Sequence, residues 1–407
     1  MPQRVLSAEL PAHVGETVLL HGWVHRRRTL KTVSFLVLRD RAGLAQVVGA
    51  DLDGHPEETA VAVTGRVVAN EVAPGGAELV DAAVTALSPP AQPPPFDLYR
   101  PEVRAGLVVQ LDAAPLAFRH PGRRAALAAS AAAVRGFRAT LDGLGFTEIF
   151  TPKLVAAATE SGANLFGVDY FGRPAYLAQS PQFYKQLMVG VFERVYEVGP
   201  VFRAEPHDTG RHLAQYTSLD AELGFIADHR DVMRVVHAAI RGMVGEAGAP
   251  LAVGEEFPAV SFADALRIAH ADPADPDEPD LAPADERAVG EWAMREHGSE
   301  FVFVTGYPLA KRPFYTAGGN SFDLLFRGME IVTGGQRLHR YDDYVAALAG
   351  RGLPLEPYRS YVDAFRYGMP PHGGFAIGLE RFVARLLGLG NVREATAFPR
   401  DRTRLEP

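Results

Sequence analysis

A proline-rich segment at residues 88–95 constrains the fold of this 407-residue chain more than any other feature. Five of its eight residues are proline, which propagates neither helix nor sheet, so the segment favours an extended, semi-rigid spacer. The length of the chain leaves room for two or three domains. We therefore predict an N-terminal domain at residues 1–90, a linker at residues 91–120 and a second domain at residues 121–407.

The part before the prolines has the pattern of a small β domain. Five short runs rich in β-branched and apolar residues are separated by turn-forming residues, and they lie at 18–24, 34–38, 44–48, 61–68 and 78–87. This spacing predicts a closed or sandwich-like domain, for which an OB-type barrel is one solution. OB folds bind oligonucleotides across strands two and three, where a basic run at 25–28 and Phe35 would lie. A barrel without a ligand has the same pattern, and a run of arginines can be a solvated face.

The part after the prolines predicts an α+β domain. An alanine-rich helix is expected at 123–144, and strand-like runs then alternate with helices near 232–244 and 285–296. The strand-like runs lie at 194–202, 216–225, 301–307, 321–326 and 329–333. We expect a largely antiparallel sheet flanked by helices, with an exposed acidic and proline-rich loop at 272–283.

Composition excludes several classes of protein. The chain has no cysteine, so disulfides, thiolate metal sites and cysteine nucleophiles are excluded. A net charge of -8 argues against a protein that coats nucleic acid indiscriminately, although a local basic patch remains possible. Because no stretch approaches the roughly 20 apolar residues of a membrane span, we expect no membrane association and a cytoplasmic location.

Two motifs have the residue types of a nucleotide site. Residues 201–205 end one strand, and the chain returns at 216–222 as a second, so the hairpin presents Arg203 and Glu205 at its base. An arginine fork can hold a phosphate and a carboxylate can accept from an amino group, but a surface salt bridge is the bland alternative. At 373–381 a glycine-rich strand enters a helix whose first turn contains Arg381. A cation there opposes the helix dipole, which suggests a bound anion or ring, while glycines kept for packing are the rival explanation.

These and other strings resemble the class II aminoacyl-tRNA synthetases. Residues 151–153 (TPK), 202–205 (FRAE) and 378–381 (GLER) are similar to motifs one, two and three of that class, in order. Four longer strings narrow the resemblance to aspartyl-tRNA synthetases: 177–186 (LAQSPQFYKQ), 334–337 (GGQR), 365–374 (FRYGMPPHGG) and 398–402 (FPRDR). The absence of a large insertion domain favours the archaeal type. The resemblance implies an OB-fold anticodon-binding domain, a class II catalytic domain and a homodimer, because motif one builds the subunit interface in this family.

The resemblance also implies an ATP site with Mg²⁺. Adenylate formation requires positioning and charge neutralisation rather than a general base. By analogy Arg203 binds the α-phosphate and the attacking carboxylate, while Arg337 and Arg381 complete the catalytic set. Glu205 would bind the adenine amino group, with Tyr216 and Arg381 on either side of the ring. The remaining expected ATP-binding residues are Ala204, Arg211, His212, Leu213, Glu330, Gly378, Leu379 and Glu380. The expected metal ligands are Glu330 and Thr333, with Asp323 as a helper.

A second implied subsite distinguishes aspartate from asparagine. Two cations, Lys185 and Arg337, occupy the positions where the family holds the side-chain carboxylate, and asparagine would leave them without a counter-charge. Glu160 and Gln182 would bind the α-amino group, and Arg203 and Thr333 complete the expected aspartate-binding set. As an alternative, Lys185 could be an ordinary charge on a helix surface.

In the barrel, Phe35 and Gln46 match the family pair that contacts the central anticodon base. His25 and Pro74 resemble residues of members that accept both aspartate and asparagine anticodons, so the expected partners are tRNA(Asp) and tRNA(Asn). The alternatives are a strictly discriminating aspartyl enzyme, an asparaginyl-type enzyme or its asparagine-forming relative, and a non-catalytic RNA-binding paralogue.

Overall fold

The computed structural model describes residues 2–29, 33–49, 52, 54–158, 165–269 and 281–407. It divides into two compact units, residues 1–122 and residues 123–407, each of which has its own hydrophobic core. The predicted division into residues 1–90, 91–120 and 121–407 stays a prediction. None of the helices in the described residues is both long enough and apolar enough to cross a membrane.

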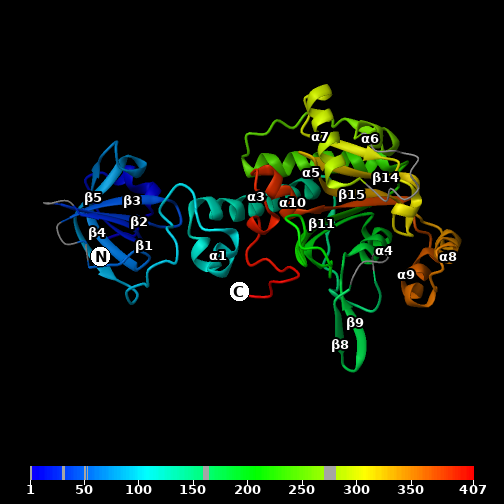
Figure 1. Ribbon diagram of the computed structural model, residues 1–407, viewed down its shortest axis with the longest axis horizontal. Coiled ribbons are helices and arrows are strands. Elements are labelled where there is room, and N and C mark those ends of the chain that lie inside the picture. Colours follow the sequence, from blue (N-terminus) through cyan, green and yellow to red (C-terminus); the bar gives the residue numbers. More distant parts are fainter. Residues whose placement is uncertain (1, 30–32, 50–51, 53, 159–164, 270–280) are drawn as a thin grey trace. The chain divides into compact units, whose positions relative to one another are not determined.

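The first unit contains a closed five-stranded barrel in the order β1-β2-β3-β5-β4 (Figure 1). Its strands are β1 (Thr17–Thr29), β2 (Ser34–Arg39), β3 (Leu44–Gly49), β4 (Ala60–Ala69) and β5 (Ala77–Ala86). Alternate residues such as Val18, Leu20, Leu36 and Leu38 point inward and form one core. The five predicted strands and the barrel are therefore confirmed. The same unit contains η1 (Ser7–His13), η2 (Pro74–Gly76), α1 (Leu107–Asp112) and α2 (Ala114–Ala117).

The second unit is built on an eight-stranded sheet in the order β12-β13-β14-β15-β16-β11-β10-β6. Its strands are β6 (Thr147–Glu148), β10 (Arg194–Phe202), β11 (Gln215–Gly224), β12 (Ala259–Ser261), β13 (Phe301–Thr305), β14 (Thr316–Phe326), β15 (Met329–Arg337) and β16 (His372–Gly378). All neighbours pair antiparallel except β6 with β10 and β12 with β13, so the predicted largely antiparallel sheet is confirmed. A second sheet contains β7 (Leu154–Val155), β9 (Arg173–Leu177) and β8 (Gly167–Tyr170).

The described residues of this unit contain eight helices, the first of which begins two residues before the boundary between the units. They are α3 (Pro121–Gly143), α4 (Gln182–Phe192), α5 (His229–Ala247), α6 (Phe262–Ile268), α7 (Pro283–His297), α8 (Tyr341–Gly350), α9 (Arg359–Val362) and α10 (Leu379–Leu386). Helix α5 begins at an Asp228 cap, whose carboxylate accepts from the Arg230 amide, and ends at Gly248 with a left-handed backbone. Residues from α3, α5 and α10 form one core with one face of the sheet. The opposite face of β11 is left for polar side chains.

One local prediction is wrong in part. The expected exposed loop at 272–283 lies largely outside the described residues, which resume at Leu281. Leu281 is buried against the core beneath α6 and α7, and Pro283 begins α7. Proline is favoured in the first turn of a helix because its missing amide hydrogen is not needed there. Pro283, one of the prolines that suggested a loop, therefore marks a helix start.

Candidate active site

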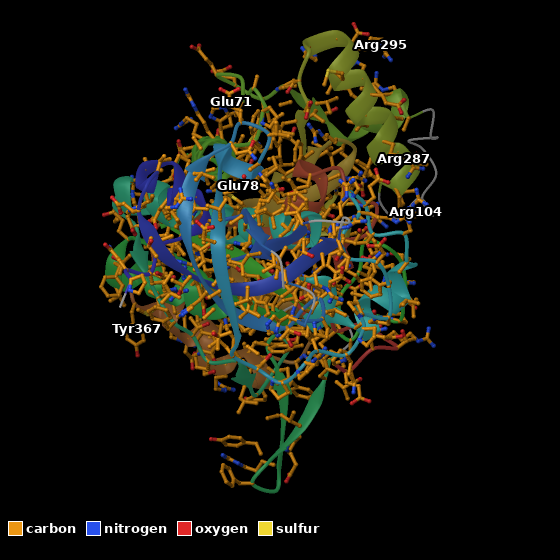
Figure 2. The ribbon with its side chains drawn as sticks, turned by 90° about the vertical axis from the view of Figure 1, so that its left-hand side faces the viewer. Glu71, Glu78, Arg104, Arg287, Arg295 and Tyr367 are labelled. Carbon is orange, nitrogen blue, oxygen red and sulfur yellow. The ribbon has the colours of Figure 1, made fainter. Side chains whose placement is uncertain are left out.

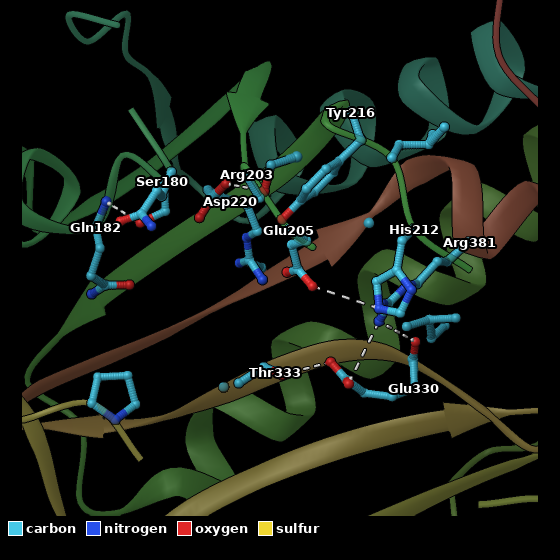
Figure 3. Close-up of a pocket in the computed structure, with 18 of the residues that line it drawn as sticks. Ser180, Gln182, Arg203, Glu205, His212, Tyr216, Asp220, Glu330, Thr333 and Arg381 are labelled. Atoms are coloured by element: carbon cyan, nitrogen blue, oxygen red, sulfur yellow. Dashed lines mark hydrogen bonds and ion pairs between the residues drawn. The ribbon is translucent and has the colours of Figure 1, made fainter. Parts of the chain in front are cut away.

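A polar cavity of about 250 Å³ lies between β11, β15 and β16 of the large sheet and the loops around them (Figure 3). Strand alternation explains its position. Leu219, Ala221 and Leu223 of β11 point into the hydrophobic core, so Asp220 and Glu222 point to the opposite face. The predicted site residues that line this cavity are Gln182, Arg203, Glu205, Arg211, His212, Leu213, Tyr216, Glu330, Thr333, Arg337, Gly378, Glu380 and Arg381.

Of the predicted site residues that the structure describes in this unit, four do not line it. Ala204 lines a neighbouring hollow, and Leu379 packs into the core because it begins the amphipathic helix α10. Asp323 is committed to an ion pair with Arg312, at 2.8 Å between Oδ2 and the guanidinium. Lys185 lies behind the cavity wall formed by Asp220, which does line it. Glu160 lies outside the described residues.

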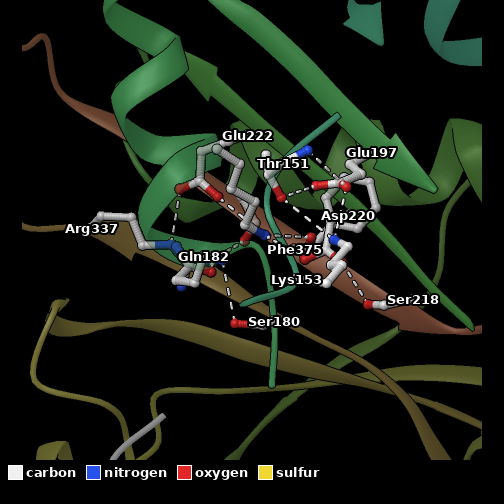
Figure 4. Close-up of polar contacts among 12 residues, drawn as sticks. Thr151, Lys153, Ser180, Gln182, Glu197, Ser218, Asp220, Glu222, Arg337 and Phe375 are labelled. Atoms are coloured by element: carbon white, nitrogen blue, oxygen red, sulfur yellow. Dashed lines mark hydrogen bonds and ion pairs between the residues drawn. The ribbon is translucent and has the colours of Figure 1, made fainter. Parts of the chain in front are cut away.

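At one end of the cavity, two cations and two carboxylates form a buried network (Figure 4). The Lys185 ammonium donates to Asp220 Oδ1 and to the Phe375 carbonyl, both at 3.0 Å, and lies 3.3 Å from Glu222 Oε2. Arg337 Nε donates to Glu222 Oε1 at 3.0 Å. Burial opposes ionisation of Glu222, but Arg337 and Lys185 outweigh it and hold the pKa of this carboxyl below its ordinary value. Lys185 is therefore not an ordinary surface charge.

The other end of the cavity is more open and carries Arg203, Arg211 and Arg381. The Arg203 amide donates to the Ala214 carbonyl at 2.9 Å, which holds Arg203 at the base of the β10–β11 hairpin. Its guanidinium lies 5.6 Å from the centre of the Tyr216 ring. Arg381 donates to the Glu330 carbonyl at 3.3 Å and lies 3.6 Å from its carboxylate. Burial and the nearby Arg381 both lower the pKa of His212, so this ring is neutral at pH 7.

Hard oxygen donors sit next to these arginines. Glu330 Oε1 accepts from the Thr333 hydroxyl at 2.9 Å. Although burial opposes ionisation, Arg381 and the Thr333 hydroxyl lower the pKa of Glu330. Within the described residues no group of three or more His, Cys, Asp or Glu side chains could hold a metal ion by itself. A carboxylate and a hydroxyl suit Mg²⁺ that takes its remaining ligands from phosphate and water. Asp323, expected as a helper, is instead neutralised by Arg312.

The motif at 151–153 is fastened to the sheet beside this site. The Lys153 ammonium donates to Glu197 Oε1 at 2.8 Å, and the Thr151 hydroxyl donates to Glu197 Oε2 at 2.6 Å (Figure 4). Glu197 lies on β10, the strand that leads to Arg203.

Sequence reasoning missed several residues that line the cavity. Ser180, Asp220, Arg312 and Tyr315 all do so, and Glu222 supports Arg337 from the same strand as Asp220. Alternation along 218–223, with Ser, Asp and Glu on one face, could have identified β11 as a wall of the site. Arg312 follows the short helix η3 (Leu309–Lys311), and no periodic pattern marks it.

On the barrel, the predicted anticodon residues fall into two environments. Arg28 of β1 lies opposite Phe35 of β2, and Gln46 of β3 lies opposite Val37, so the basic and aromatic side chains share the outer face. His25 is buried instead, 3.2 Å from Arg39 and edge-on to the Tyr99 ring. Burial and Arg39 lower the pKa of His25. Pro74 begins η2 between β4 and β5.

Two family models match the chain. Residues 108–402 match "tRNA synthetases class II (D, K and N)", and residues 18–85 match the "OB-fold nucleic acid binding domain". The chain is also 49% identical to the "Aspartate--tRNA(Asp/Asn) ligase" of Thermus thermophilus, over 99% of this chain and 100% of the relative. The chain belongs to the class II aspartate–tRNA ligases. The corresponding protein of Deinococcus radiodurans is 46% identical over 100% of this chain and 99% of its own length.

A solved structure is similar over its whole length. The asparaginyl-tRNA synthetase from Pyrococcus horikoshii, complexed with asparaginyl-adenylate, has a TM-score of 0.91 and 30% identity, with both chains covered completely. The predicted family and the predicted fold, an OB barrel followed by a class II catalytic domain, are confirmed. The chain is therefore an ATP-dependent aminoacyl-tRNA synthetase.

Proposed function

We propose that this chain activates L-aspartate with ATP and transfers it to the 3′ end of tRNA(Asp) and of tRNA(Asn). The observation that carries the aspartate assignment is the buried network in which Glu222 holds both Lys185 and Arg337, at 3.3 Å and 3.0 Å, beside the cavity that Arg203 lines. Two fixed cations favour a carboxylate over a neutral amide. The curated relatives from Thermus and Deinococcus carry the name aspartate–tRNA(Asp/Asn) ligase, which supports the wider tRNA range.

In the first step a carboxylate oxygen of aspartate attacks the α-phosphorus of ATP, and pyrophosphate leaves. We assign the α-phosphate and the attacking carboxylate to Arg203, because its planar fork can neutralise both. Tyr216 and Arg381 line the same cavity, which suits an adenine ring between an aromatic face and a guanidinium. In the second step the terminal ribose hydroxyl of tRNA attacks the activated carbonyl, and AMP leaves.

Mg²⁺ is the expected metal. Glu330 and Thr333 would hold it at the nucleotide end of the cavity. When bound, it neutralises phosphate charge and stabilises the leaving pyrophosphate. Arg203, Arg211 and Arg381 supply the remaining positive charge from the protein itself.

The barrel is proposed to bind the anticodon. We also propose the domain division predicted from the sequence, at residues 1–90, 91–120 and 121–407. Phe35 and Gln46 lie on its outer face, where a base can stack and be read along its edge. Buried His25 would act through its neighbours Arg39 and Tyr99 rather than through direct contact. A strictly discriminating enzyme is the alternative.

We also propose a cytoplasmic homodimer. Exposed Phe150 and Leu154 flank the 151–153 motif, with 82% and 48% of their surface accessible, which is unusual for large apolar side chains. Sedimentation of the chain and of a Phe150→Ser variant would test this, because the variant should dissociate at a higher protein concentration.

The deciding experiment charges purified tRNA(Asp) and tRNA(Asn) with aspartate, alongside aspartate-dependent pyrophosphate exchange. Exchange with aspartate, and charging of both tRNAs, is the expected result. Exchange with asparagine instead of aspartate would refute the amino-acid assignment, and charging of tRNA(Asp) alone would refute the wider tRNA range.

A further inference from the structure

A second cavity in the catalytic unit, of about 230 Å³, is lined by three arginines: Arg211, Arg287 and Arg385. The other described residues around it are apolar, glycine or Asn391, so no carboxylate is among its lining residues. Arg211 also lines the active-site cavity and is therefore shared between the two. Arg287 and Arg385 line only the second one.

The three arginines come from separate elements that pack closely. Arg211 lies in the β10–β11 loop, Arg287 lies on α7 and Arg385 lies near the end of α10. Gly328, in the turn between β14 and β15, has a left-handed backbone (φ +68°), and a Cβ there would come within 2.8 Å of Arg287 Cα. Direct backbone packing therefore fixes the position of Arg287. Figure 2 shows Arg287 and Arg295 on the same helix, with Arg295 farther along it.

Positive charge in this cavity is only partly compensated. Glu286, a buried neighbour on α7, pairs with Arg211 and also accepts from the Glu330 amide at 2.9 Å, so its carboxylate is already engaged. Arg385 Nε is buried and has no hydrogen-bond partner within the part of the chain that the structure describes. Burial, reinforced by Arg211, lowers the pKa of Arg385. Arg211 and Arg385 are partly buried and Arg287 is exposed. Guanidinium groups of like charge that line one cavity are stabilised by an anion with several oxygens.

We propose that this arginine cavity is a second anion site, separate from the ATP-binding cavity, and that it binds pyrophosphate. The identity of the ligand rests on the proposed function, because aspartate activation releases pyrophosphate beside Arg211. A phosphate group of RNA offers the same chemistry, but pyrophosphate carries several negative charges and is small enough for a cavity of about 230 Å³, so it matches three arginines that line one cavity better than one phosphodiester does. Arg211 would contact pyrophosphate on its departure, and Arg287 and Arg385 would hold it.

The test is calorimetric titration of pyrophosphate into the full-length protein, with the ATP-binding cavity saturated by α,β-methylene-ATP. One pyrophosphate should bind per chain under these conditions. Arg287→Gln and Arg385→Gln should each weaken this binding by about tenfold or more, which corresponds to the loss of one charge-assisted contact. The matched control, Arg295→Gln, removes an exposed arginine from the same helix and should change nothing. None of the three variants should alter the affinity for the ATP analogue.

Three results would overturn the inference. Pyrophosphate binding that disappears when the ATP analogue is present would mean that a single site exists. Unchanged binding in both cavity variants, each shown to be folded by thermal unfolding, would mean that these arginines do not hold pyrophosphate. If instead the variants weaken binding of an acceptor-stem RNA duplex but not of pyrophosphate, the cavity serves RNA. The titration requires no aspartylation. If the protein binds pyrophosphate but does not aspartylate tRNA, the proposed function fails and this site does not.

Discussion

The two ends of the active-site cavity hold their cations in different ways. At the amino-acid end, Lys185 and Arg337 are almost fully buried and share Glu222, which is itself completely buried. At the nucleotide end, Arg381 keeps 27% of its side chain exposed and meets the part-exposed carboxylate of Glu330. One end is a buried network of two cations and two carboxylates, of which Arg337 also lines the cavity, whereas the other leaves guanidinium groups partly exposed.

This difference indicates a division of labour. A buried, fully paired network resists rearrangement and can reject a ligand of the wrong charge, because an uncompensated charge in its interior is expensive. Partly exposed arginines can replace their weak contacts within the protein by contacts to phosphate oxygens, and this requires little rearrangement of the protein. Mutations at the first end should therefore affect both stability and amino-acid use, and mutations at the second should affect mainly chemistry.

The largest effect should come from Lys185→Met. The change removes one cation and leaves Asp220 and Glu222 buried with only Arg337 to balance them. We expect a loss of roughly 3–5 kcal/mol, seen as at least about a 100-fold fall in kcat/KM for aspartate in pyrophosphate exchange and a lower free energy of unfolding. Lys153→Met, which breaks the similar pair with Glu197, is the control and should leave the aspartate KM unchanged. If kcat/KM for aspartate is the same in Lys185→Met as in the wild type, the buried network takes no part in amino-acid binding.

A smaller loss of activity is expected for Arg203→Lys. Lysine keeps the charge but cannot form a planar fork to the phosphate and the carboxylate, so kcat in pyrophosphate exchange should fall by about 100-fold, roughly 3 kcal/mol. The free energy of unfolding should change less than it does in Lys185→Met. If both variants lose equal stability, the proposed difference between the two ends is wrong.

Carboxyl groups at the two ends of the cavity should also affect the pH dependence of stability differently, because the pKa of Glu222 is lowered and that of Glu380 is raised. Glu380 is buried and accepts from the Thr217 amide at 3.0 Å, and burial raises its pKa to about 7. The folded state therefore holds a proton that the unfolded state has released, and the stabilisation present at low pH is lost as pH rises from about 4.5 to 7. Between pH 5 and 7, wild-type stability should fall by about 2 kcal/mol relative to Glu380→Gln in urea unfolding. Parallel curves for the two proteins would show that Glu380 is ionised throughout.

The smallest effect should lie outside both ends of the cavity. Phe35→Leu removes an aromatic ring from the outer face of the barrel, so the KM for tRNA should rise by about tenfold, in line with roughly 1–3 kcal/mol per stacked base. Pyrophosphate exchange, which needs no tRNA, should not change. A Val18→Leu change in the barrel core is a useful contrast, because it alters packing and not the outer face. If tRNA charging is unaffected by Phe35→Leu, this face is not the anticodon site.

Local patterns predicted most of the fold. The five barrel strands, the helix from 121 and the strands β10, β11 and β13 were all expected within a few residues of their observed positions, because alternation and helical spacing act over short distances. Helix α7 was expected at 285–296 and begins two residues earlier, at Pro283, because a proline that suggests a loop also fits the first turn of a helix. The resemblance located most of the residues that line the cavity. It could not show that Lys185 lies behind the cavity wall.

The sequence by itself determined the family, the two kinds of domain and the residue types of the site, since these depend on short strings and local periodicity. Only the tertiary structure decided the partners of those residues. Glu222 lies 115 positions from Arg337, and Arg312, which precedes β14, pairs with Asp323 on that strand; no local pattern encodes these contacts. It also decided that His25 is buried and that Arg211 is shared by two cavities. Charge pairing in a protein interior depends on which distant segments the packing of the core brings together, and that is a property of the whole fold.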